Sequence, residues 1–254
     1  CRCNLLSSNI VIKLLSYRII LLMKIEIKNL KKKFNENFVL KDISLKIEKN
    51  KSTIILGESG CGKSVLIKTI YKLFGFDRGS ILYDGKSKVD IDKFSMLFQY
   101  GALFDSLTLS ENIAFTDYMD NKINYSKKVK SLMADVGLDA SNYDKYPSEV
   151  SGGMKKRAAL ARALYKNPKV IFLDEPTTGL DPINSDLIND LIIKVIKKRK
   201  ITAVTITHDI KSAIKTGDNF YFIHKGITQE EGRCDKILTT KNKLFKSFIT
   251  GARY

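Results

Sequence analysis

The sequence predicts an α/β fold built on a mainly parallel sheet, and two observations support this prediction. Short apolar runs rich in Ile, Val and Phe alternate along the chain with longer segments of helical periodicity, as in proteins whose parallel strands are joined by helices. The stretch GESGCGKS, Gly57 to Ser64, follows one such apolar run and precedes a helical pattern. A glycine-rich loop in that position is typical of phosphate-binding α/β proteins.

The expected strands differ in how they are buried. Residues 24–30 and 39–48 alternate apolar and polar side chains, which indicates strands with one face against the core. Continuous apolar or β-rich runs predict the other strands, which are residues 52–57, 94–98, 169–174 and 201–207.

Helical patterns lie between these strands. The first runs from Lys63 to Phe74, and residues 110–163 are mostly helical with breaks at Gly137 and Pro147. Residues 185–199 form an amphipathic pattern that ends in a basic run. Because positive charge at a helix C-terminus complements the helix dipole, we interpret this run as a solvated end rather than a nucleic-acid site. The sequence shows no repeat and no low-complexity linker.

The chain carries a formal net charge of +17. Such a charge can indicate an anionic partner, either a nucleic acid or an acidic membrane surface. Here the lysines are scattered rather than gathered in one block, so a general compositional drift toward Lys, Ile and Asn explains the charge better. The four cysteines and two histidines show no zinc-binding spacing, and a disulfide framework is not typical of so large a chain, which agrees with a reducing compartment.

The first 22 residues differ from the rest of the chain. Lys13 and Arg18 interrupt their apolar run, which is therefore too short and too charged to span a bilayer. No small-residue cleavage site follows, as a signal peptide requires. Met23 opens the first strand pattern, so we expect Met23 to be the true start and residues 1–22 to be a non-native or disordered extension. The alternative is an amphipathic helix on a membrane surface.

The loop from Gly57 to Ser64 has the chemistry to bind a phosphate chain. Its glycines allow backbone N–H groups to curl around phosphate oxygens, and the following helix directs its positive N-terminus toward them. Lys63 can neutralise β and γ phosphate oxygens, and the Ser64 hydroxyl can ligate Mg²⁺. Cys61 is interpreted as a small residue of the loop rather than a nucleophile.

The run VIFLDEP, residues 170–176, delivers two carboxylates at the end of a buried strand. Ligands bind at the carboxyl edge of the strands in open α/β sheets. Asp174 can therefore contribute to an Mg²⁺ shell, and Glu175 can polarise an attacking water.

A third motif, SGGMKKR, lies at an expected helix start. Ser151 is a suitable N-cap, and the bare N–H groups of Gly152 and Gly153 can approach an anion. An ordinary capped helix is the alternative interpretation.

These motifs together resemble those of the nucleotide-binding subunits of ABC transporters, over residues 23–254. Gly57–Ser64 matches the Walker A motif, VIFLDE the Walker B motif, and VSGGM the signature. The remaining matches are Gln99 to the Q-loop, Thr178–Asp181 to the D-loop, His208 to the switch histidine, and Phe34 to the aromatic residue that stacks on adenine. Val150 and Met154 replace the Leu and Gln of the usual signature.

The resemblance implies a P-loop NTPase fold of the ABC ATPase type, with a mainly parallel sheet, an antiparallel β edge and a helical insertion over about residues 99–163. It implies ATP and Mg²⁺ as cofactors, and ATP hydrolysis as the activity. The residues implied for nucleotide binding are Phe34, Gly57, Glu58, Ser59, Gly60, Cys61, Gly62, Lys63, Ser64, Val65, Ser151, Gly152 and Gly153. Those implied for the metal are Ser64, Gln99 and Asp174, and those implied for catalysis are Glu175, His208 and Gln99.

Four runs narrow the resemblance to ATPases of bacterial phospholipid-trafficking systems of the Mla type: SVLIK, GALFDSLT, SGGMKKRAALARAL and DEPTTGLDPI. This similarity implies a homodimer that works with an integral membrane permease and an MCE-type lipid-binding protein. It implies no nucleic-acid partner. It places the chain at the cytoplasmic face of the bacterial inner membrane, held there through the permease.

There are three alternative interpretations. The first is that the chain is the ATPase of another importer or exporter subfamily. A DNA-associated ABC ATPase carries a long coiled coil between phosphate loop and signature, whereas here Ser64 and Ser151 are 87 positions apart without sustained heptads. A two-cassette translation factor needs a second cassette, and this sequence shows one.

The segment FQYGALFDSLTLSENIAF, residues 98–115, is unusually apolar. We expect Phe98 to end a buried strand and lie in the core. The resemblance implies that Leu103, Phe104 and Leu107 form an apolar surface that receives a helix of the permease. The alternative is that these side chains pack the insertion onto the sheet.

Overall fold

The strands form one curled, mixed sheet. The computed structural model describes residues 23–122 and 124–251, so the expectation for residues 1–22 lies outside the described residues. Within this part the strand order is β4-β1-β2-β9-β8-β3-β7-β6-β5. The strands are β1 (Ile25–Phe34), β2 (Asn37–Ile47), β3 (Ser52–Leu56), β4 (Arg78–Tyr83), β5 (Phe94–Leu97), β6 (Val170–Asp174), β7 (Thr202–Ile206), β8 (Asn219–His224) and β9 (Ile227–Arg233).

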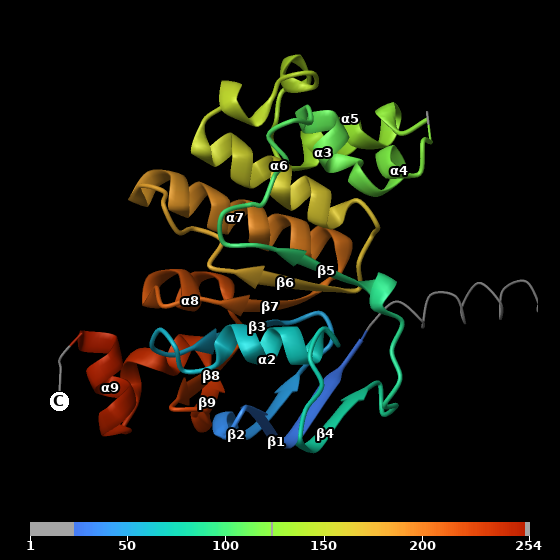
Figure 1. The fold of residues 1–254 in the computed structure, drawn as a ribbon. Coiled ribbons are helices and arrows are strands. Elements are labelled where there is room, and N and C mark those ends of the chain that lie inside the picture. Colours follow the sequence, from blue (N-terminus) through green and yellow to red (C-terminus); the bar gives the residue numbers. More distant parts are fainter. Residues whose placement is uncertain (1–22, 123, 252–254) are drawn as a thin grey trace, which may run out of the picture.

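Parallel pairing joins β8, β3, β7, β6 and β5 in the centre and at one edge of the sheet (Figure 1). Antiparallel pairing joins β9 to β8, and joins β1 to both β2 and β4 at the opposite edge. A single parallel pair, Asp42 with Ile227, connects the two regions. The predicted α/β fold with a mainly parallel sheet and an antiparallel β edge is confirmed.

The helices follow the strands as the alternating pattern predicts. They are α2 (Lys63–Ile70), α3 (Leu109–Ile113), α4 (Phe115–Met119), α5 (Ser126–Asp135), α6 (Gly152–Leu164), α7 (Pro182–Arg199), α8 (Ile210–Thr216) and α9 (Lys243–Thr250). The short 3₁₀ segments in this part of the chain are η1 (Ile91–Lys93), η2 (Ala140–Asn142), η3 (Pro147–Glu149) and η4 (Cys234–Thr239). No helix within residues 23–122 and 124–251 is long and apolar enough to cross a membrane.

Successive side chains of a strand point to opposite faces of the sheet, so neighbouring residues of the parallel strands pack in different clusters. Ile171 and Leu173 of β6 pack with buried residues of α6 and α7. Phe172 packs in a second cluster, which encloses α2 between the parallel strands and the antiparallel strands. Ile54 and Leu56 of β3 belong to a third cluster with α8, η4 and α9.

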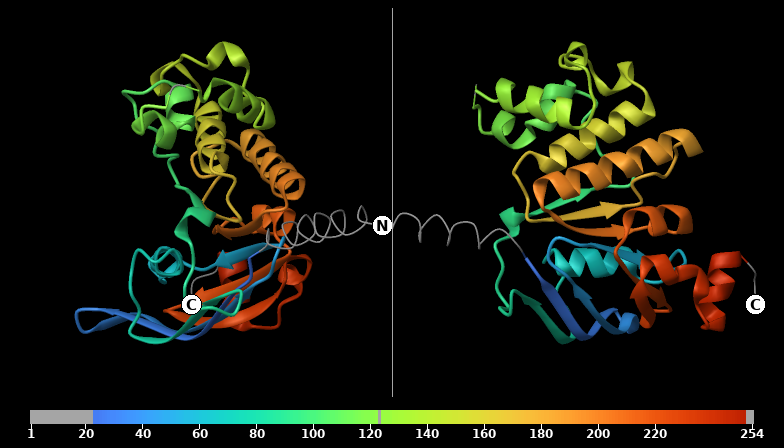
Figure 2. Two further views of the ribbon diagram at one scale, coloured as in Figure 1. Left: turned by 90° about the vertical axis from the view of Figure 1, so that its right-hand side faces the viewer. Right: turned by 180° about the vertical axis from the view of Figure 1, so that it is seen from behind.

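The predicted helical insertion forms the end of the molecule opposite the antiparallel strands (Figures 1 and 2). A capping box between Thr108 and Glu111 starts α3. The buried Asn112 holds the preceding loop, since its side chain donates to the Leu107 carbonyl at 2.9 Å and accepts from the Phe104 N–H at 2.8 Å. The predicted breaks are confirmed, because α5 ends before Gly137 and η3 begins at Pro147.

Several expectations about single elements are wrong. The helix from Lys63 ends at Ile70 rather than Phe74, and Lys72 has a φ of 65°, in which a right-handed helix cannot continue. β5 ends at Leu97, so Phe98 lies outside the core with 44% of its surface exposed. The sequence patterns did not reveal β4, β8, β9, α8 and α9.

Candidate active site

Four neighbouring parallel strands end at one edge of the sheet and bring the sequence motifs together. The phosphate loop follows β3, His208 follows β7, Asp174 ends β6, and Gln99 follows β5. Since β3 pairs with β7, β7 with β6 and β6 with β5, all four chain segments leave the sheet side by side. This edge is the carboxyl edge, where open α/β sheets bind ligands.

The phosphate loop needs glycine for steric reasons at two positions. A Cβ on Gly57 would lie 2.3 Å from the Ile223 carbonyl oxygen, which no side chain can accommodate. Gly62 has a φ of 104° and occupies the N-cap of α2, where no side chain caps the helix. The N-terminus of α2 is therefore open to an anion in the cleft.

Lys63 is folded back over the loop that it follows. Its side chain is buried, and Nζ donates to the carbonyl oxygens of Gly57 and Glu58, each at 2.7 Å. Burial raises the pKa of the nearby Cys61 thiol, against the opposing positive charge of Lys63. Cys61 is thus a neutral, buried side chain, which agrees with its interpretation as a structural residue of the loop.

The two carboxylates at the end of β6 have different electrostatic surroundings. Burial raises the pKa of Asp174, and the negative charge of Glu175 adds to this effect, while Lys63 opposes it. Burial also acts to raise the pKa of Glu175, but hydrogen bonds from Thr178 and His208 outweigh it and the net pKa is lowered. The surroundings of Glu175 therefore favour its ionised form, whereas those of Asp174 disfavour its charge.

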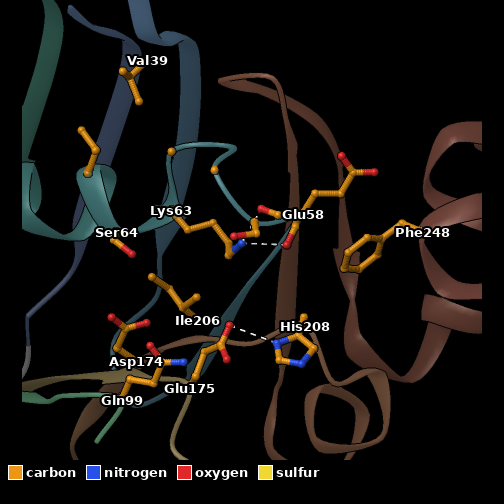
Figure 3. Close-up of a pocket in the computed structure, with 15 residues that line it drawn as sticks. Val39, Glu58, Lys63, Ser64, Gln99, Asp174, Glu175, Ile206, His208 and Phe248 are labelled. Atoms are coloured by element: carbon orange, nitrogen blue, oxygen red, sulfur yellow. Dashed lines mark hydrogen bonds and ion pairs between the residues drawn. The ribbon is translucent and has the colours of Figure 1, made fainter. Parts of the chain in front are cut away.

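Glu175 is fixed by contacts at both carboxylate oxygens. Oε2 accepts from the Thr178 hydroxyl at 2.7 Å. Oε1 lies 3.0 Å from Nδ1 of His208, a contact shown in Figure 3. Its backbone N–H donates to the Ile206 carbonyl at 2.9 Å. Its φ is 45°, a strained backbone angle for a residue other than glycine. The local backbone thus turns the carboxylate away from β6 and toward the end of β7.

A cleft of about 680 Å³ contains most of the predicted residues. That volume is in the range of small-molecule sites. Figure 3 shows the phosphate loop on one side of the cleft and Gln99, Asp174 and Glu175 on the other. The predicted residues that line it are Gly57, Glu58, Ser59, Gly60, Gly62, Lys63, Ser64, Val65, Gln99, Asp174, Glu175 and His208.

Three further residues line the cleft, and sequence reasoning did not find them: Val39, Ile206 and Phe248. Val39 and Ile206 belong to β2 and β7. Phe248 comes from α9, which packs on β8 through Phe245. The Phe248 ring centroid lies 5.2 Å from that of Phe222. An apolar helix near the chain end gave no signal of its position beside the phosphate loop.

Some predicted residues lie elsewhere. Phe34 and Cys61 do not line the cleft. The Phe34 ring packs edge-on against Phe74, with centroids 5.4 Å apart. Ser151, Gly152 and Gly153 start α6 away from the cleft, and the Ser151 hydroxyl caps this helix by accepting from the Met154 N–H at 3.3 Å.

The donors in the cleft suit Mg²⁺ rather than a transition metal. Ser64 supplies a hydroxyl, Asp174 a carboxylate and Gln99 an amide oxygen, all facing the same space. No group of three or more His, Cys, Asp or Glu side chains in the described part of the chain could hold a metal by itself. Mg²⁺ is usually held by one or two carboxylates together with substrate phosphates and water, so these oxygen donors fit it.

Sequence comparisons agree with this geometry. Residues 40–178 match the family model described as ABC transporter. The chain is 33% identical, over 90% of its length and 69% of the relative's, to the probable ribonucleotide transport ATP-binding protein mkl of Mycobacterium leprae. It is also 33% identical, over 89% of its length and 90% of the relative's, to MlaF of Haemophilus influenzae, an intermembrane phospholipid transport system ATP-binding protein.

Two solved structures resemble the fold. One is a dimeric, post-hydrolysis ATP-binding cassette bound to ADP and Pi, with TM-score 0.70 and 27% identity over 83% of this chain and 98% of that one. The other is cbiO1 of Clostridium perfringens, part of the ABC transporter complex cbiONQ, with TM-score 0.76 and 27% identity over 88% and 93%. ABC ATPases bind ATP with Mg²⁺. The chain belongs to the ABC transporter family, as the ATP-binding and ATP-hydrolysing subunit of a transport system.

Proposed function

We propose that this subunit powers phospholipid trafficking, as a homodimer bound to a membrane permease that works with an MCE-type lipid-binding protein. The observation that carries the cargo assignment is the pair of runs GALFDSLT and SGGMKKRAALARAL, which are similar to phospholipid-trafficking ATPases. Similarity to MlaF along nearly all of both chains supports it. The subunit would then lie at the cytoplasmic face of a bacterial inner membrane, held through the permease.

In this proposal, the phosphate loop and Lys63 bind the β and γ phosphates. Nζ of Lys63 contacts two loop carbonyls, and phosphate oxygens would replace these contacts when the nucleotide binds. Ser64, Asp174 and Gln99 would hold the metal, which would neutralise charge on the phosphates. The raised pKa of Asp174, caused by burial and by Glu175, supports this role, because a cation beside Asp174 would stabilise its ionised form.

Glu175 is the general base in this proposal. A base must be ionised and oriented before it can accept a proton from the attacking water. Thr178 and His208 meet both requirements, since they fix the carboxylate at 2.7 and 3.0 Å and lower its pKa against the effect of burial. His208 is mostly exposed and lines the same cleft, where it would contact the γ-phosphate.

Ser151, Gly152 and Gly153 would complete the nucleotide site of the partner subunit. A Cβ on Gly152 or Gly153 would meet its nearest neighbour at an ordinary 3.8 or 3.7 Å, so packing within the subunit does not require glycine there. Bare N–H groups at the start of a 13-residue helix are suited to approach a phosphate from outside. The dimeric cassette bound to ADP and Pi supports a two-fold arrangement of this kind.

The segment after Gln99 would receive a helix of the permease. Tyr100 is 80% exposed and Phe104 is 45% exposed, whereas Leu103 is partly buried against the insertion. Exposed aromatic residues beside a nucleotide-contacting segment are suited to an apolar helix-in-groove contact. Residues 23–254 would then act as one ATPase domain in which residues 99–163 contact the permease.

Reconstitution tests the cargo. The chain is co-purified with its permease and placed in proteoliposomes, and ATP-dependent transfer of a fluorescent phospholipid is measured beside uptake of labelled ribonucleotides and glutamate. We expect phospholipid transfer that requires ATP and that is lost in Glu175→Gln. Uptake of a ribonucleotide without phospholipid transfer would refute the cargo assignment and would favour the function named for mkl.

A further inference from the structure

Lys156 lies in the basic run of α6 but does not belong to the surface. Only 7% of its area is exposed, whereas Lys155 and Arg157 on either side are partly exposed. A lysine is seldom buried to this extent without a strong partner for its ammonium group. In the part of the chain that the structure describes, no carboxylate forms an ion pair with Lys156.

The partner of Lys156 is the backbone of the cleft. Its Nζ donates a hydrogen bond to the carbonyl oxygen of Gln99. Gln99 lines the cleft with Asp174 and Glu175, and the negative charges that act on Lys156 come from these two residues. The buried ammonium group of Lys156 in α6 thus contacts the backbone of Gln99, a residue of the proposed metal site.

Arg162 extends this connection along the same segment. Its guanidinium donates to the carbonyl oxygens of Gly101 and Ala102, at 2.6 and 2.7 Å. The backbone also approaches α6 closely, since a Cβ on Gly101 would lie 3.3 Å from that of Ala159. Two cations of α6 therefore hold three carbonyls within the segment 99–102.

We propose that Lys156 is a positioning residue of the nucleotide site, which fixes the backbone of Gln99 so that its side chain can meet the metal-bound nucleotide. Because Lys156 and the Ser151–Gly153 motif share α6, the same contact ties the cleft of one subunit to the motif that faces the partner's nucleotide. This inference rests on the roles proposed above for Gln99 and for Ser151–Gly153.

The test compares Lys156→Met with Lys155→Met, which removes the same charge one residue away at a partly exposed position. Binding of a fluorescent ATP analogue is measured in EDTA and in Mg²⁺, and the ATPase rate is measured against Mg²⁺ concentration. We expect Lys156→Met to bind the analogue normally in EDTA, but to lose roughly 10-fold or more of the affinity gained from Mg²⁺ and of kcat. Lys156→Arg should recover most of both, and Lys155→Met should match the wild type.

Wild-type Mg²⁺ dependence of binding and rate in Lys156→Met would overturn the proposal. An equal loss of binding in EDTA would also overturn it, because that result indicates a general structural role. If Lys156→Met does not fold, Lys156→Gln, which keeps an N–H donor without the charge, is held to the same criteria.

Gln99→Ala, measured in parallel, distinguishes a failure of the role proposed for Gln99 from a failure of the inference about Lys156. If Gln99→Ala binds and hydrolyses Mg-ATP as the wild type does, the role proposed for Gln99 fails, and the inference about Lys156 fails with it. If Gln99→Ala is impaired and Lys156→Met is not, only the inference about Lys156 fails.

Discussion

Oε1 of Glu175 lies 3.0 Å from Nδ1 of His208, although the two residues are 33 positions apart in the chain. The contact exists because β6 and β7 are neighbours and end together, with Asp174 opposite Ile206. It places the proposed base against an exposed imidazole at the mouth of the cleft. The pairing of β6 with β7 thus orients the carboxylate.

Two variants of the cleft should both lose ATP hydrolysis, but for different reasons. Glu175→Gln keeps the size of the side chain and removes the base, so we expect kcat to fall by roughly 100-fold or more while ATP still binds and holds the dimer. Lys63→Ala removes the charge that faces the phosphates, so ATP binding itself should weaken. Equilibrium nucleotide binding and size-exclusion chromatography distinguish these results. Hydrolysis at the wild-type rate by Glu175→Gln would show that another group is the base.

Asp174→Asn should stabilise the chain when nucleotide and Mg²⁺ are withheld. Burial and the charge of Glu175 raise the pKa of Asp174 above its ordinary value, so its ionised form costs folding free energy. This cost is complete above the folded pKa and disappears as the pH falls below the unfolded pKa. We therefore expect a higher melting temperature for Asp174→Asn near neutral pH in EDTA, and a shrinking difference toward about pH 4.

The exposed loop variant Asp105→Asn is the control for this comparison and should melt as the wild type does. Addition of Mg-ATP should reverse the order, because Asp174 then contributes to binding in the wild type and Asn does so less well. A lower melting temperature of Asp174→Asn in EDTA at neutral pH would contradict the electrostatic argument.

Phe248→Ala should weaken ATP binding. This ring comes from α9, lines the cleft beside the phosphate loop and packs on Phe222. Loss of an aromatic contact with a ligand costs about 0.5–1.5 kcal/mol, which is roughly a 2- to 10-fold weaker Kd. Leu244→Ala is the matched control, because Leu244 packs on the same cluster from the same helix but does not line the cleft. It should lower the melting temperature and leave Kd unchanged, and an equal effect of both variants on Kd would assign Phe248 a purely structural role.

Phe104→Ala should release the permease without unfolding the chain. The Phe104 ring is 45% exposed and stacks on Phe115, with centroids 4.5 Å apart. Docking predicts a folded, ATP-binding protein that no longer co-purifies with its permease. Core packing predicts instead a melting temperature lower by several degrees, since truncation of a buried Phe costs roughly 3–5 kcal/mol.

Met119→Ala controls for the loss of any exposed apolar side chain in the insertion, because Met119 is 61% exposed and lies in α4. We expect it to keep the permease. Early melting of Phe104→Ala with the permease retained would show that the ring only packs the insertion.

The parts of this protein whose physics is local could be predicted from the sequence. A phosphate loop needs glycines, a lysine and a hydroxyl at fixed spacing, so Gly57–Ser64 was recognisable without any knowledge of its neighbours. The same holds for Asp174 and Glu175 at the end of a continuous apolar strand, and for the Ser151 cap of α6. Continuous apolar or β-rich runs also marked β3, β6 and β7, which are almost fully buried, whereas β5 at the sheet edge is only partly buried.

Which of these segments meet depends on the tertiary fold. The period of a strand reports burial but not its partner, so the order β3-β7-β6-β5 and the Glu175–His208 contact could not be read from the sequence. Phe98 was misplaced because an aromatic residue after an apolar run looks buried until the end of β5 is known. Lys156 appeared as one of several basic residues, and its burial against the Gln99 carbonyl depends on how α6 packs over a segment 57 residues earlier. Contacts between distant segments depend on the whole arrangement of sheet and helices, which no local pattern encodes.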